Sequence, residues 1–117
     1  MLQKVNLKSA ADAIGQLQVY GNVGRLNGHT LSVVNAEHRT LDFHTHEHSD
    51  ELFYVIEGGF RLETGEGCVE VNAGELVIVP RGTRHRPVVT ALCKVLLIEL
   101  EGTLNKENSG DLYEDSP

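Results

Sequence analysis

The stretch FHTHEHSDELFYVIEGG, residues 43–59, joins a cluster of histidines to an apolar strand. Three histidines fall within five residues, at positions 44, 46 and 48. Alternate side chains of a strand point to the same side, so we expect His44 and His46 to point together. Two imidazoles on one face can converge on a single transition-metal ion.

Glu51 follows His46 by five residues, which would place it on the opposite face of an unbroken strand. The intervening residues 47–50 are polar and turn-prone. A bend there would return Glu51 to the histidine face and begin a new strand over residues 51–57. We therefore expect this carboxylate to join the two imidazoles.

A further histidine, His85, ends the segment VPRGTRH, residues 79–85. Pro80 and Gly82 mark a rigid turn after a strand, and such a turn aims the side chain that follows it. The remaining histidines are not favoured as metal ligands. His48 shares the parity of His44 and His46 but lies in the proposed bend, so we favour an exposed loop residue over a ligand. For His29 and His38 we expect surface or satisfied core positions.

The rest of the chain shows short apolar stretches separated by Gly, Asn, Pro and Asp. This pattern predicts an all-β sandwich or barrel. The expected strands cover residues 30–35, 39–46, 51–57, 60–63, 68–71, 76–79, 85–89 and 93–100. A capping-box-like segment at Ser9 predicts one short helix that ends near Gly15.

Composition excludes several classes of protein. The chain has 117 residues, enough for one domain, and its net charge of −7 argues against a nucleic-acid partner. No apolar run is long enough for a membrane span, and residues 1–15 lack a signal-peptide core, so we expect a cytoplasmic protein. Cys68 and Cys93 are expected as reduced thiols in or near the core. Residues 101–117 carry five acids and one lysine and are expected to form a solvated, mobile tail.

Together the two histidine segments resemble the two motifs of the cupin superfamily. The first motif, G-x5-H-x-H-x3-4-E-x6-G, is matched by His44, His46, Glu51 and Gly58, with His38 in place of the leading Gly. The second, G-x5-P-x-G-x2-H-x3-N, is matched from Gly74 through Pro80 and Gly82 to His85, with Val89 in place of the closing Asn. The 15-residue gap between the motifs resembles that of small single-domain microbial cupins.

This resemblance implies a double-stranded β-helix, a jelly-roll barrel, over residues 1–100. It also implies that His44, His46, Glu51 and His85 hold one divalent metal ion, with Fe, Mn, Ni, Co, Cu or Zn all suited to these donors. Four protein ligands in an octahedral shell would leave two positions for substrate, water or dioxygen.

Strand parity predicts the surroundings of the site. Phe53 and Val55 share the face of Glu51 and are expected to line the cavity, whereas Tyr54 faces outward. Leu41 and Phe43 are expected outside the lumen, as part of an apolar outer face. Either the chain itself or a partner subunit must cover that face. The apolar outer face and the resemblance to cupins together favour a homodimer.

We expect a metal-dependent enzyme of dioxygenase or isomerase type that acts on a small polar molecule. A non-catalytic module that binds or senses a small molecule or metal is the alternative. A purely structural metal ion is a third interpretation, and it predicts that removing the metal unfolds the protein.

Overall fold

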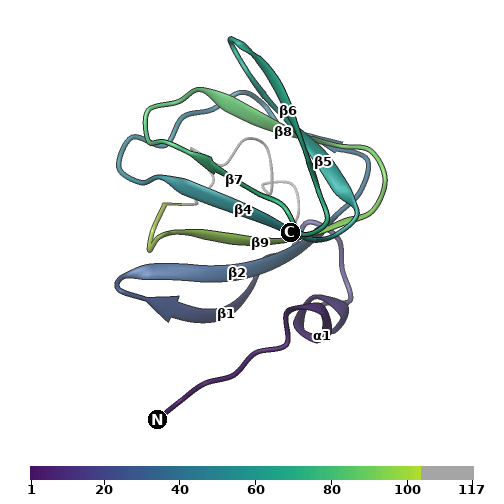
Figure 1. Cartoon of the computed structure of the whole chain (residues 1–117), viewed down its shortest axis with the longest axis vertical. Coiled ribbons are helices and arrows are strands. Elements are labelled where there is room, and N and C mark those ends of the chain that lie inside the picture. Colours follow the sequence, from purple (N-terminus) through teal and green to yellow (C-terminus); the bar gives the residue numbers. More distant parts are fainter. Residues whose placement is uncertain (104–117) are drawn as a thin grey trace.

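The computed structural model describes residues 1–103 and arranges them in two antiparallel sheets that face each other (Figure 1). One short helix, α1 (Leu7–Asp12), precedes the sheets. The strands are β1 (Gly21–Leu26), β2 (His29–Ala36), β3 (Arg39–Thr40), β4 (Glu51–Glu57), β5 (Gly59–Thr64), β6 (Gly67–Asn72), β7 (Leu76–Val79), β8 (His85–Val89) and β9 (Cys93–Leu100).

The larger sheet has the strand order β1-β2-β9-β4-β7, and the smaller has the order β3-β8-β5-β6. Apart from the hairpins β1–β2 and β5–β6, neighbouring strands are not consecutive in sequence, because the chain crosses from one sheet to the other repeatedly. This is the double-stranded β-helix that the cupin resemblance implies, with a short N-terminal helix.

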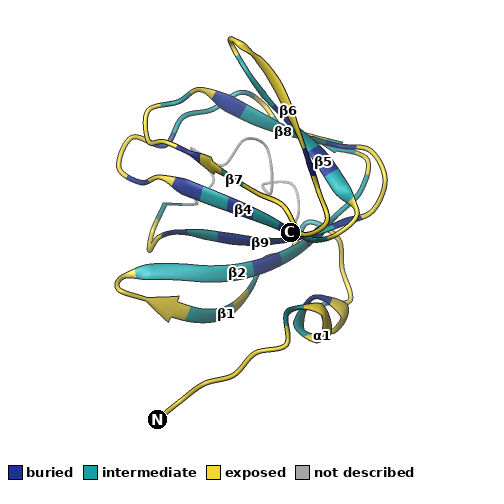
Figure 2. Ribbon diagram, in the orientation of Figure 1, coloured by how far each residue is buried: buried dark blue, intermediate teal, exposed yellow. Residues whose placement is uncertain are grey.

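The core fills the space between the sheets (Figure 2). Its buried side chains come from the inward positions of strands in both sheets: Phe53, Val55, Phe60, Leu62, Val71, Val79, Val89, Cys93, Val95 and Leu97. A second cluster lies where α1 packs on the outer face of the larger sheet, around Ala11, Val33 and Leu96. The Asn35 side-chain amide donates to the carbonyl of Ala11 at 2.8 Å and ties the helix to β2.

The helix begins earlier than the sequence indicates. Asn6 is its N-cap, and the Asn6 side chain accepts a hydrogen bond from the Ser9 amide at 2.9 Å. Asparagine is among the strongest N-cap residues, so it takes the position predicted for Ser9. The helix ends at Asp12, three residues before Gly15.

Two strand predictions are wrong. The predicted strand 39–46 shrinks to β3, because Pro87 lacks an amide hydrogen and the pairing with β8 shifts by one residue beyond Thr40. The edge strand β1 was missed, because Gly21 and Gly24 weaken its strand signal and a bulge interrupts its register with β2.

The two cysteines differ in their surroundings. Cys93 is buried, and burial raises the pKa of its thiol to about 11. Cys68 is exposed on β6, so its expected place in or near the core is wrong. Both are free thiols.

The first residues of the predicted tail are described. Glu101 pairs with Arg25 of β1 at 2.5 Å, and its amide donates to the Gly28 carbonyl at 2.9 Å. The rest of the predicted tail, residues 104–117, lies outside the described residues. Across residues 1–103, we find no helix with the length and apolar character needed to cross a membrane.

Candidate metal centre

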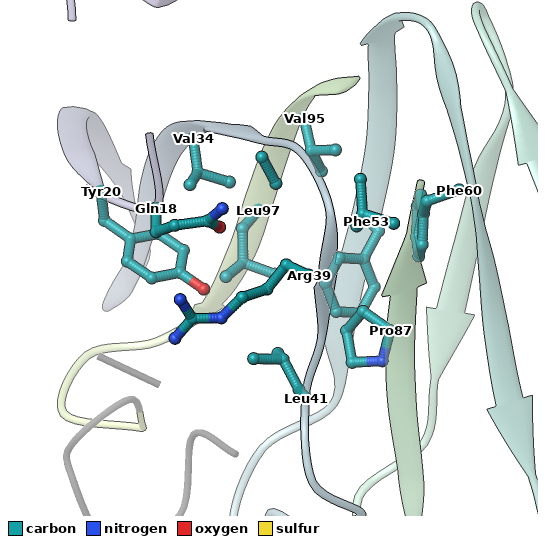
Figure 3. Close-up of a pocket in the computed structure, with 12 residues that line it drawn as sticks. Gln18, Tyr20, Val34, Arg39, Leu41, Phe53, Phe60, Pro87, Val95 and Leu97 are labelled. Carbon is teal, nitrogen blue, oxygen red and sulfur yellow. The ribbon is translucent and has the colours of Figure 1, made fainter. Parts of the chain in front are cut away.

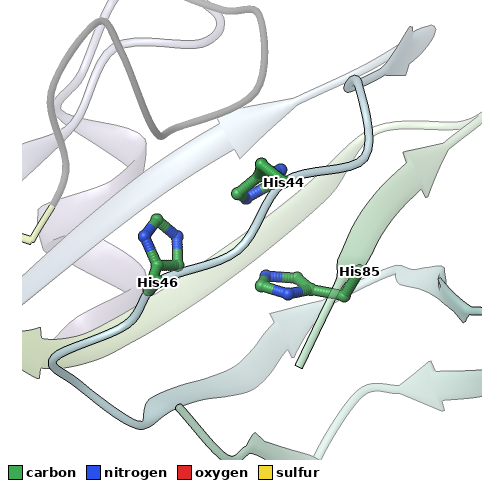
Figure 4. A group of neighbouring side chains, drawn as sticks. All are labelled: His44, His46 and His85. Atoms are coloured by element: carbon green, nitrogen blue, oxygen red, sulfur yellow. The ribbon is translucent and has the colours of Figure 1, made fainter. Parts of the chain in front are cut away.

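Three histidines meet inside the barrel (Figure 4). His44 and His46 come from the segment that follows β3, and His85 begins β8. The ring centroids are 5.0 Å apart for His44 and His46, 4.5 Å for His44 and His85, and 5.6 Å for His46 and His85. One nitrogen of each ring lies within 4.8 Å of the others, which is close enough for all three to hold one ion.

The backbone explains why these rings converge although the predicted strand breaks. His44 and His85 exchange two backbone hydrogen bonds of 3.0 Å each and form an isolated bridge between the two segments. The Gly82 amide donates to the His46 carbonyl at 2.8 Å, so the turn before His85 also fixes His46. The two motif segments are thus joined directly by main-chain contacts.

Glu51 completes the cluster at the start of β4. Its Oε1 lies 3.0 Å from His85 Nε2 and its Oε2 lies 3.2 Å from His46 Nε2, and the residue is 2% exposed. The expected bend is present: Ser49 Oγ accepts from the Leu100 amide at 2.9 Å, and Asp50 accepts from the Arg81 amide at 2.9 Å. The structure therefore brings together all four residues that the sequence singled out, and their ligation of an ion stays a prediction.

The other histidines lie away from the cluster. His48 is exposed in the bend, as expected. His29 Nδ1 lies 3.2 Å from the carbonyl oxygens of Leu26 and Asn27 in the β1–β2 turn. His38 is exposed, between β2 and β3.

Hydrogen bonds at the far side of two rings fix their orientation. His44 Nδ1 donates to the Asp42 carbonyl and His85 Nδ1 donates to the Thr83 carbonyl, each at 2.8 Å. Such bonds fix the tautomer and leave Nε2 directed into the site. His46 is 3% exposed, its Nδ1 has no hydrogen-bond partner, and its Nε2 faces Glu51 Oε2 at 3.2 Å. Because an unsatisfied buried imidazole is costly, this ring fits a ligand for a metal ion.

Two of the three pKa shifts in the site, those of Glu51 and His44, favour that assignment. Burial alone would raise the pKa of Glu51, but contacts with His46 and His85 outweigh it and hold that pKa below the usual range. Burial lowers the pKa of His44, which favours the neutral imidazole that metals bind. Burial also acts to lower the pKa of His85, but the hydrogen bond to Glu51 raises it overall.

A second carboxyl group, which the sequence did not reveal, stands beside Glu51. Glu99 of β9 is paired directly with Glu51 across the strands, is 3% exposed and hydrogen-bonds to it. Burial and the neighbouring Glu51 raise the pKa of Glu99 to about 10. Its signal in the sequence is an acid at an inward position of an otherwise apolar strand, after Val95 and Leu97.

A cavity of about 60 Å³ is lined in part by Phe53 and Pro87, which lie two positions along their strands from Glu51 and His85 (Figure 3). Phe53 lines it as expected, whereas Val55 is buried in the core. Leu41 also lines the cavity, so the expectation that Leu41 lies outside the lumen is wrong. The pairing with β8 shifts by one residue between Thr40 and His44, so alternation counted back from His44 gives the wrong face for Leu41. Tyr54 packs in the outer cluster against α1, as its outward position predicts.

Phe43 is not among the residues that line the cavity. Its ring packs under the guanidinium groups of Arg84 and Arg86, each 4.5 Å from the ring centroid. Arg86 also donates to Glu63 at 2.8 Å. These two arginines thus serve the barrel surface rather than the cavity.

Known proteins with similar sequences and structures share this architecture. A family model described as Cupin domain (Cupin_2) matches residues 31–99. The protein YdbB of Bacillus subtilis is 30% identical over 89 residues, which cover 74% of this chain and 76% of YdbB.

Two solved structures are close in fold. A cupin-2 domain-containing protein from Shewanella frigidimarina has a TM-score of 0.78 and 25% identity, over 83% of this chain and 94% of that protein. A Neisseria meningitidis protein has a TM-score of 0.75 and 27% identity, over 85% of this chain and all of that protein. With the family match across more than half of its length, this chain belongs to the Cupin_2 family of small single-domain cupins.

Proposed function

We propose that this cupin holds one divalent transition-metal ion on His44, His46, Glu51 and His85. We further propose that it is a mononuclear metal-dependent enzyme, of dioxygenase or isomerase type, that acts on a small molecule. The observation that supports this most is the convergence of three buried or half-buried imidazoles and a carboxylate beside a cavity.

The donor set suits several first-row metals, because three imidazoles and one carboxylate are ligands of intermediate hardness. When bound, such an ion would polarise a chelating oxygen of the substrate or lower the pKa of a bound water. The chain's own groups orient and shield this chemistry. The carbonyls of Asp42 and Thr83 hold two rings in place, Glu51 supplies negative charge, and apolar walls exclude bulk water.

The alternative function is a module that binds or senses a small molecule without turnover. It is favoured by the lining of the cavity, in which the described residues include no carboxylate or histidine that could serve as a general acid or base. Under this alternative the same ligands would hold an ion that only anchors the bound molecule.

Metal content is the first test. The protein is purified without chelators or nickel affinity steps, and bound metals are measured by mass spectrometry. We expect close to one ion per chain, lost in His44→Ala/His85→Ala and kept in the matched variant His38→Ala/His48→Ala, which removes two exposed histidines. A wild-type protein that folds but takes up no divalent ion would overturn the metal site.

A second measurement separates a catalytic ion from a structural one. With Mn²⁺ loaded, an ion with open positions enhances water-proton relaxation, whereas a fully closed site does not. We also expect the metal-free protein to keep a cooperative thermal transition. Complete unfolding on chelation, together with no relaxation enhancement, would instead support the structural interpretation.

A further inference from the structure

The cavity has polar side chains at one end, and these are engaged within the protein (Figure 3). The Gln18 backbone amide donates to the Asn35 carbonyl at 2.8 Å, and its side-chain amide donates to the Glu37 carbonyl at 3.2 Å. Tyr20 and Arg39, which lie beside Gln18 in Figure 3, each already interact with other residues of the chain. Among the described residues, this end therefore offers a ligand no uncommitted charge.

The other walls of the cavity are apolar. Nine of the twelve described residues that line it have apolar side chains, and they come from both sheets, with Phe53 and Leu97 in the larger sheet and Phe60 and Pro87 in the smaller. The rings of Phe53 and Phe60 form one corner, with centroids 5.5 Å apart and planes at 59°. A charged group between such walls would lose its hydration without gaining a partner. The cavity therefore fits an uncharged, apolar group.

The apolar walls continue the inward rows of side chains that carry the candidate ligands. On β4, Phe53 follows Glu51 by two positions, and on β8, Pro87 follows His85 by two. Side chains two apart on a strand share a face and are separated by about 7 Å along it. A molecule with its polar end at the metal centre can therefore extend a short tail into the cavity.

The volume of the cavity limits the size of that tail. An apolar cavity of about 150 Å³ holds one benzene molecule in another protein. This cavity, at about 60 Å³, is less than half as large and has room for roughly two to four carbon atoms. The group that it takes is therefore a short aliphatic chain rather than a ring.

From these observations we infer that the substrate carries an uncharged aliphatic tail of about two to four carbons, which lies between Phe53, Phe60 and Leu97 while its polar end faces the metal centre. This inference rests on the proposed function, because it names the substrate class for the same site. It excludes molecules with a carboxylate or an amine at the tail end, since the cavity has no committed partner for either charge.

Alkyl hydroxamates test this on the Zn²⁺-loaded protein, because their two oxygens chelate a metal ion and leave the tail to enter the cavity. Calorimetry compares acetohydroxamate with hexanohydroxamate, which has a longer tail on the same head group. We expect hexanohydroxamate to bind at least about tenfold more tightly, since each buried CH₂ contributes roughly fourfold. Adipic monohydroxamate and 5-aminopentanohydroxamate replace the terminal methyl by COO⁻ or NH₃⁺, and each should bind at least about tenfold more weakly than hexanohydroxamate.

Variants then locate the tail. Ala36→Leu narrows the cavity, so we expect it to remove most of the gain from the longer tail and to leave acetohydroxamate binding unchanged. Ala73→Leu makes the same substitution at an exposed position between β6 and β7 and should keep the wild-type preference. Xenon binding to metal-free protein, followed by NMR, probes the cavity alone and should be lost only in Ala36→Leu. Thermal unfolding shows that each variant is folded, and the series on the wild-type protein needs neither variant.

The outcomes separate this inference from the proposed function. Equal affinity for the two alkyl hydroxamates, or tighter binding of adipic monohydroxamate than of hexanohydroxamate, would overturn the inference and leave the metal centre intact. A protein that takes up no metal ion would overturn the proposed function, and xenon would then test the cavity by itself. Xenon binding that Ala36→Leu abolishes would support an apolar site, whereas a wild-type protein that binds no xenon would overturn it.

Discussion

At the scale of single residues, His38 holds a left-handed backbone conformation with φ of +54°. It replaces the glycine that opens the first cupin motif, and its amide donates to the Thr90 carbonyl at 3.0 Å. Left-handed conformations cost L-residues about 1–2 kcal/mol and glycine much less. At the position of the motif glycine, this chain therefore has a positive φ although the residue is a histidine.

We predict that His38→Gly leaves the free energy of unfolding unchanged or raises it by up to about 1 kcal/mol. His38→Val should lower it by about 1 kcal/mol or more, because a β-branched side chain is a poor fit to this conformation. Urea denaturation measures both. A valine variant as stable as wild type would show that the turn does not constrain this position.

A second prediction at this scale concerns Glu99. Its pKa is raised from an ordinary 4.5 to about 10, chiefly by burial, so the folded chain keeps a proton that the unfolded chain loses. The stabilisation that this retained proton gives the folded state is present in full below pH 4.5 and is lost as pH rises toward 10. Glu99→Gln cannot lose this proton.

In metal-free protein, we expect the stability of Glu99→Gln relative to wild type to rise between pH 5 and pH 8 by at least about 1 kcal/mol. Thermal or urea unfolding at both pH values measures this difference. Glu70→Gln, at an exposed position of β6, is the control and should show no such change. A constant difference between Glu99→Gln and wild type would contradict the buried neutral carboxyl.

At the scale of elements, alternation of inward and outward side chains located most of the barrel. Strands β4, β7, β8 and β9 have the bounds that the sequence predicts, because turns with Gly, Asn or Pro separate them. The end of β3 could not be predicted in this way. Its pairing shifts by one residue between Thr40 and His44, and this depends on β8 rather than on local sequence.

In the site, too, some residues follow from local sequence patterns and others depend on the pairing of distant strands. The sequence alone identified the four candidate ligands, because they lie at the spacings of the two motifs: His44, His46, Glu51 and His85. Glu99 lies 48 positions after Glu51 and becomes its neighbour only through the register of β4 and β9. The place of Leu41 in the cavity depends on the same kind of long-range pairing. The sequence shows an acid at an inward position of the strand 93–100, but not which residue of another strand it pairs with.

The β4–β5 hairpin yields a prediction at this scale. Gly58 joins the two strands with φ of +84°, and a Cβ there would lie 2.4 Å from the Leu92 carbonyl oxygen. Gly58→Ala therefore combines an unfavourable φ with a backbone clash, and we expect a loss of at least about 2 kcal/mol.

Gly65 offers the matched control in the β5–β6 hairpin. A Cβ at Gly65 meets nothing within 4 Å, and its φ is not in the positive range. Gly65→Ala should change the free energy of unfolding by less than about 1 kcal/mol in either direction. Equal losses for the two variants in urea denaturation would refute the role of the Leu92 contact.

At the scale of the whole molecule, the larger sheet has an outer face that is only partly covered. Helix α1 packs on it around Val33 and Leu96, with Tyr54 and Ile56 of β4 at the edge of this cluster. Farther along, Leu76 and Ile78 of β7 are 54% and 55% exposed. Adjacent exposed apolar side chains on a flat sheet face are typical of an interface.

We predict that a second copy of the chain covers this part of the sheet and forms a homodimer with two-fold symmetry, in which the same face of each copy meets the other. Light scattering after size exclusion should give twice the 12.9 kDa mass of one chain. Leu76→Lys/Ile78→Lys places like charges at the centre of such an interface and should yield monomers with an unchanged fold. Val69→Lys, at a 53% exposed position of β6 in the other sheet, should leave the dimer intact. A wild-type protein that stays monomeric at several hundred micromolar would disprove this assembly, and the outer face of β7 would then be a surface that tolerates exposed leucine and isoleucine.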